Sequence, residues 1–174
     1  MCGLRHPGRA DGWGPLAAEH VDRLIAMMHA EGDYMPETVE ARGLIGPVHE
    51  NVVPNIVDKL EVADVNQNAI HHFRLKAFEA LARFEPKAAP AVPYLIRFIK
   101  NPPPVHSSVA IGDVIGALQA LRAIGAEAAK DAIPAVRNLT DPKVVRHEVY
   151  AELRREAALT LDVLCGKTPA SGSN

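Results

Sequence analysis

Apolar residues recur along most of this chain at intervals of three and four, which is the spacing of one face of a helix. A helix over 107–124, for example, places Ile111, Val114 and Leu118 on one stripe. The same spacing predicts further helices over residues 15–29, 36–45, 52–62, 71–84, 90–100 and 131–139, and a last helical segment that reaches Leu164. Turns rich in proline, glycine or asparagine separate these stretches. The pattern therefore predicts an all-α protein.

A short phrase repeats within this helical pattern. Each copy ends in a β-branched residue and a proline, and Pro54, Pro93 and Pro134 lie 39 and 41 residues apart. A proline costs little in the first turn of a helix, so each one marks the place where a helix begins. A period near forty residues, filled with helical spacing, indicates an array of helix pairs.

A left-handed turn is expected where the first helix of each pair ends. Glycine suits this conformation because it has no Cβ atom, and Gly46 and Gly125 stand at this place in the first and third copies. Glu85 stands there in the second copy, so it should cost some stability unless the turn has another shape. Ala80 and Ala120 precede the turns and should let the helices approach closely.

The repeated phrase resembles the HEAT repeat, in which each unit is an antiparallel pair of helices. In that family Ala-Leu-x-x-Ile-Gly closes the first helix and Val-Pro opens the second. The match is closest over 117–136, extends to 79–95 and 40–56, and ends in a half-unit at 158–166. The resemblance implies an α-solenoid of about three and a half repeats, preceded by an N-terminal helix over 15–29. It says little about function, because such arrays serve many roles.

Length and composition are those of one folded domain with flexible ends. The chain has 174 residues, of which 48% are hydrophobic and only 5% aromatic, so its core must be built from Ala, Val, Ile and Leu. We expect a single helical domain over 15–166. An N-terminal arm over 1–14 and a disordered tail over 167–174 should flank it, since both are rich in glycine or small polar residues.

Charge and cysteine content argue against several classes of function. The net charge is −2, so no basic bias points to nucleic acid or to an anionic membrane. Cys2 and Cys165 fit no metal-binding or redox spacing and should be reduced thiols. No stretch approaches eighteen apolar residues and no signal peptide is recognisable. These features predict a cytoplasmic protein with no membrane partner.

The candidate binding surface follows from the resemblance, because the second helices line the concave face of such arrays. Positions one, four and seven after each proline should then point outward. These positions are Asn55, Asp58 and Glu61, then Tyr94, Arg97 and Lys100, and then Ala135, Asn138 and Asp141. Their charges are mixed, whereas a groove that follows phosphates would be basic along its length.

We therefore expect a non-catalytic module that binds another protein or acts as a scaffold. Tyr and Arg are frequent at binding hot spots, so Tyr94, Arg97 and Lys100 are the expected anchors. Flanking contacts are assigned to Asn55, Asp58 and Asn138. The exposed ends of a short array also allow self-association. A HEAT-like nucleic-acid-binding protein is the alternative.

A metal-dependent enzyme is a further alternative. Arg146-His147-Glu148 resembles a motif of deoxyhypusine hydroxylase, a di-iron HEAT-repeat enzyme with His-Glu pairs in several repeats. One unit earlier, His106 is followed by Ser107 rather than by a carboxylate. The pair His49-Glu50 falls in a turn between helices. One pair cannot supply a di-iron site, so we expect no catalytic residue, no metal and no cofactor.

Overall fold

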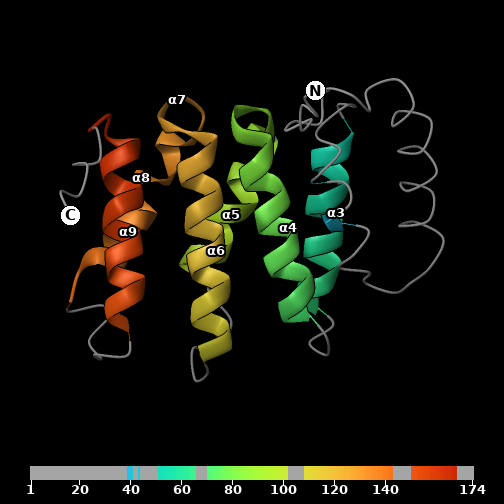
Figure 1. Cartoon of the computed structure of the whole chain (residues 1–174), viewed down its shortest axis with the longest axis horizontal. Helices are drawn as coiled ribbons and strands as arrows, with labels where there is room; N and C mark the ends of the chain where they lie inside the picture. The colour runs from blue at the N-terminus through green and yellow to red at the C-terminus, as the bar shows by residue number, and fades with distance from the viewer. Residues whose placement is uncertain are drawn as a thin grey trace, which may run out of the picture.

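The computed structural model describes residues 39, 40, 43, 51–65, 70–101, 108–142 and 150–167, and every regular element among them is a helix (Figure 1). The predicted all-α class is confirmed for this part of the chain. The predicted N-terminal arm over 1–14 and the helix over 15–29 lie outside the described residues. So does the predicted tail, except for Lys167.

The helices begin and end close to the predicted places. They are α3 (Val52–Val65), α4 (Ile70–Phe84), α5 (Val92–Lys100), α6 (Ser108–Ile124), α7 (Ala126–Ala129), α8 (Ile133–Thr140) and α9 (Ala151–Leu164), with 3₁₀ helices η2 (Glu85–Ala91) and η3 (Lys130–Ala132) between them. One local prediction is wrong. Asp131 does not cap α8 but lies inside η3, and the helix begins after Ala132 with no capping side chain.

The helices form two layers. Helices α4, α6 and α9 lie side by side, while α5 and α8 lie behind them (Figure 1). Helices of the two layers that follow one another in the chain pack together. Helix α3 packs on α4, α5 packs on α6 and α8 packs on α9. We call α4, α6 and α9 the first layer, and α3, α5 and α8 the second layer.

Neighbouring first-layer helices run parallel, about one repeat apart in sequence. The Thr160 hydroxyl of α9 donates a hydrogen bond to the Leu118 carbonyl of α6, 42 residues earlier and 3.3 Å away. A Cβ atom added at Gly116 of α6 would lie 3.2 Å from Phe78 of α4. Small residues at these contacts let the backbones approach, and Ala80 and Ala120 are fully buried as the alanine pattern predicts.

The turns that end the first-layer helices share one backbone feature. Glu85, Gly125 and Gly166 have φ angles of 54°, 92° and 73°, and they follow α4, α6 and α9. Positive φ favours glycine because other residues meet a clash at Cβ. Gly125 therefore has the positive φ expected at the end of the repeated phrase, but its ψ of 167° lies outside the left-handed helical region that was predicted. Glu85 also has a positive φ without being glycine.

Candidate functional site

Most positions predicted to point outward from the second layer do so. Asp58 and Glu61 on α3, Lys100 on α5 and Asn138 on α8 are exposed, whereas Asn55 is half-buried. Arg97 of α5 is the best placed of the predicted anchors, with 59% of its side chain exposed. We call these six residues the second-layer row. Their part in binding a partner stays a prediction.

Tyr94 does not belong to this exposed row, and its predicted outward position is wrong. The residue is only 2% exposed, and Ala135, at the equivalent place in α8, is also buried. Both lie in the first turn of a short helix, where side chains lean back towards the N-terminus and onto the preceding element. Tyr94 instead supports its neighbour, since the Arg97 guanidinium lies 5.5 Å from the centre of its ring.

An ion pair crosses the second layer from α3 to α5. The Arg97 guanidinium contacts the Glu61 carboxylate, and both side chains are about half exposed. Water competes for such a pair, so it contributes little to stability. The pair nevertheless orients Arg97, which is held by Glu61 on one side and by the face of Tyr94 on another.

A second group of charges joins α4 to α6 inside the protein. Asp113 of α6 is 1% exposed, yet His71 Nδ1 lies 2.6 Å from its Oδ1 and Arg74 Nη1 lies 3.4 Å from its Oδ2. Burial raises the pKa of the Asp113 carboxyl above its usual range, although His71 and Arg74 act in the opposite direction. We call these three residues the charge cluster. It satisfies an acid that the core would otherwise not tolerate.

Aromatic rings connect the charge cluster with the second-layer row. The Arg74 guanidinium lies 5.5 Å from the centre of the Phe98 ring. That ring stacks on Tyr94 with centres 6.1 Å apart, and Tyr94 lies under Arg97. Phe78 adds an edge contact to Phe98 at 5.3 Å. A continuous series of contacts therefore runs from one layer to the other, with an arginine at each end of the ring pair.

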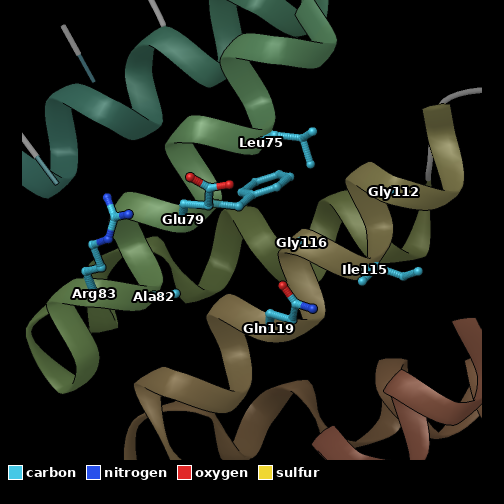
Figure 2. Close-up of a pocket in the computed structure, with 9 residues that line it drawn as sticks. Leu75, Glu79, Ala82, Arg83, Gly112, Ile115, Gly116 and Gln119 are labelled. Atoms are coloured by element: carbon cyan, nitrogen blue, oxygen red, sulfur yellow. The ribbon is translucent and has the colours of Figure 1, made fainter. Parts of the chain in front are cut away.

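A groove of about 300 Å³ opens between α4 and α6. Figure 2 shows the residues that line it, which are Leu75, Glu79, Ala82 and Arg83 from α4 and Gly112, Ile115, Gly116 and Gln119 from α6. Phe78 also lines it. The two glycines lie one turn apart and remove side chains from the α6 wall. The surface is thus apolar between the helices, with polar groups on both rims.

The sequence contains signals for the charge cluster and for the groove, and the repeat pattern does not account for them. Asp113 falls between Ala110 and Ala117 on the apolar stripe of its helix, where an acid needs a partner. Gly112 and Gly116 interrupt a helix interior, where glycine costs roughly 0.5–1 kcal/mol unless close approach requires it. What the sequence does not reveal is that His71 and Arg74 face Asp113, because that depends on how α4 and α6 dock.

The sequence predicts no metal site and names a metal-dependent enzyme only as an alternative. Among the residues that the structure describes, no group of three histidine, cysteine or acidic side chains is placed to hold a metal ion. His106, His147 and Glu148 lie outside the described residues.

Cys165 is exposed and forms no disulfide. In the described ranges, no helix combines the length and apolar character needed to span a membrane.

Comparison of the chain with protein-family models, with curated proteins and with solved structures finds no match.

Proposed function

We propose that this chain is a short HEAT-like α-solenoid that binds another protein through the second-layer row. The repeat period, the parallel first-layer helices and the shared positive-φ turns support the repeat array. Of the three predicted anchors, Arg97 and Lys100 are kept and Tyr94 is dropped, because Tyr94 is buried.

The observation that carries the proposal is the support given to Arg97. Its guanidinium is held over the Tyr94 ring and against Glu61 while more than half of the side chain stays exposed. A side chain that is ordered before binding loses less entropy when a partner arrives. Arginine is also a frequent hot-spot residue, because it combines planar hydrogen bonding with stacking.

The charges around Arg97 point to a protein rather than to a nucleic acid. Asp58 and Glu61 make the α3 end of the row acidic, whereas Arg97 and Lys100 make the α5 part basic. A phosphate backbone would be repelled at the α3 end, whereas a protein surface with both signs of charge can match the whole row.

The proposal is tested by affinity purification from lysate with quantitative mass spectrometry. The double variant Arg97→Glu/Lys100→Glu should lose the specific partner that the wild-type chain retains. Arg155→Glu, an exposed site on α9 in the other layer, is the matched control and should retain it. Equal retention by all three proteins would overturn the assignment, as would steeply salt-dependent binding to duplex DNA in its place.

A further inference from the structure

The two aromatic rings of α5 are not a requirement of the repeated phrase. Counted from the proline that opens each helix, Tyr94 of α5 corresponds to Ala135 of α8. By the same count, Phe98 corresponds to Leu139. Ala135 and Leu139 are buried as well, so α8 closes its part of the core with two aliphatic side chains. Burial at these positions therefore does not by itself explain why α5 carries rings.

The arginine above the rings is equally particular to α5. Asn138 stands at the place of Arg97 in α8, and Asp58 stands there in α3. The helix that carries the ring pair is thus also the helix that carries the arginine. This coincidence indicates that the rings serve the arginine rather than the core alone.

Buried contacts connect this arginine with the charge cluster in the other layer. Arg74 lies 3.4 Å from Asp113 and 5.5 Å from the centre of the Phe98 ring. The planes of Phe98 and Tyr94 differ by 22°, with centres 6.1 Å apart, and the Arg97 guanidinium lies 5.5 Å from the Tyr94 ring. Apart from Arg97, each of these residues is at most 8% exposed. A close-packed interior transmits a displacement from one side chain to the next.

The Arg97 side chain has two arrangements open to it, held against the protein or free in water. Its ion pair with Glu61 is exposed, and such a pair alone holds a long side chain weakly. The face of the Tyr94 ring adds a cation–π contact to the held arrangement. The position of that ring therefore decides how often the guanidinium is held.

We propose that the buried Arg74–Asp113 pair positions Arg97 through the rings of Phe98 and Tyr94, and so tunes the second-layer row from the other layer. Tyr94 holds the guanidinium directly, Phe98 acts through Tyr94, and Arg74 acts through Phe98. The consequence for binding rests on the proposed function, because it needs a partner that docks on Arg97. Release of the guanidinium lowers the affinity for that partner by about two- to tenfold, which is the cost of ordering one long side chain on binding.

The test measures the order of the Arg97 side chain by NMR in the full chain without a partner. Relaxation of the ¹⁵Nε–¹Hε group gives its order parameter, and Arg97→Lys identifies the signal by removing it. The wild-type value should stay above about 0.6, below which a group is flexible. Tyr94→Leu should bring it below that value, whereas Tyr94→Phe should not, because it keeps the ring. Phe98→Leu should lower it too, although Phe98 does not hold the guanidinium directly.

Two comparisons separate positioning from a general loss of stability. Phe84→Leu changes a ring that is equally buried but stacks on no other ring in the part of the chain that the structure describes, so it should leave the order of Arg97 unchanged. Asp113→Asn should lower the order of Arg97 in the wild-type background. In the Phe98→Leu background it should add nothing, because the ring that carries the effect is gone.

Four results would overturn the proposal. They are a flexible Arg97 in the wild-type chain, an unchanged Arg97 in Phe98→Leu, an equal loosening in Phe84→Leu, and an Asp113→Asn substitution that either has no effect or acts undiminished without Phe98.

The positioning and the proposed function fail separately. If Arg97 loosens as expected but Arg97→Glu/Lys100→Glu retains the same proteins as wild type, the positioning is supported and the binding role of the second-layer row is overturned. If the double variant loses the partner but Phe98→Leu leaves Arg97 ordered, the positioning alone is overturned.

Discussion

Two of the ion pairs that join helices in the described part of the chain differ in their access to water. Arg74 meets Asp113 between α4 and α6 in the interior, whereas Arg97 meets Glu61 between α3 and α5 at the surface. Each pair joins an arginine to a carboxylate, and the two residues lie 39 positions apart in the first pair and 36 in the second. The difference indicates that the buried pair fixes how the helices dock, while the exposed pair leaves an arginine accessible to solvent, which the proposed binding site requires.

The largest expected effect comes from breaking the buried pair. Asp113→Ala should lower the free energy of unfolding by about 3 kcal/mol, because Arg74 is left in the interior without its carboxylate. Denaturant unfolding followed by circular dichroism measures this loss. Asp113→Asn should cost less, since it keeps the volume and part of the hydrogen bonding. A loss below that of an ordinary surface substitution would show that the charge cluster is not structural.

Substitution of an aromatic ring that lies between the two ion pairs should have the next largest effect on stability. Phe98 contacts Arg74, Tyr94 and Phe78, so Phe98→Leu should lower the unfolding free energy by about 1–2 kcal/mol. Phe84→Leu is the matched control, because Phe84 is equally buried and its ring stacks on no other ring in the described part of the chain. The same denaturant series compares them. Equal losses would mean that the ring contacts add nothing beyond burial.

The turn between the layers should give a smaller effect of opposite sign. Glu85 has a φ of 54°, which glycine adopts without strain, so Glu85→Gly should raise the unfolding free energy by about 0.5–1 kcal/mol. Thermal unfolding measures this gain as a higher Tm. Gly125→Ala is the converse control and should lower the Tm. A lower Tm in Glu85→Gly would show that the glutamate is not strained.

The pH dependence of stability should also differ between buried and exposed acids. The pKa of Asp113 is raised by burial, so its stabilising contribution is complete below its unfolded pKa and is lost as the pH rises through the folded value. The pKa of Glu40 is lowered by Lys76, so its contribution is present above the unfolded pKa and is lost as the pH falls through the folded value. The free energy of unfolding should be measured from pH 3 to 7 for wild type, Asp113→Asn and Glu40→Gln. The difference from wild type should change with pH in opposite directions for the two variants. If the three curves of unfolding free energy against pH are parallel, these pKa shifts do not affect stability.

Much of the fold was predictable because it depends on local spacing. The apolar stripes located α4, α5 and α6 to within a few residues, and the prolines located the start of α5 and α8. The positive φ at Gly125 followed from the end of the repeated phrase. Such features are fixed by neighbours in the chain, so the sequence reports them directly.

The sites were less predictable because they depend on packing. Counting from the proline placed Arg97 and Lys100 outside correctly but also placed Tyr94 there, since a fixed offset ignores how first-turn side chains lean. His71 and Asp113 are 42 residues apart and meet only because α4 and α6 run parallel with nearly one repeat of offset. The groove arises from the same docking, and the sequence alone hints at it only through Gly112 and Gly116.

The most direct test applies one chemical change to both layers. Arg74→Gln and Arg97→Gln each remove a guanidinium, and denaturant unfolding measures the free energy of each variant. Arg74→Gln should lose at least about 2 kcal/mol, because it leaves Asp113 buried without that partner. Arg97→Gln should stay within about 0.5 kcal/mol of wild type, because its pair is exposed. Equal losses in the two variants would contradict the account in which Arg74 stabilises the fold and Arg97 remains accessible at the surface.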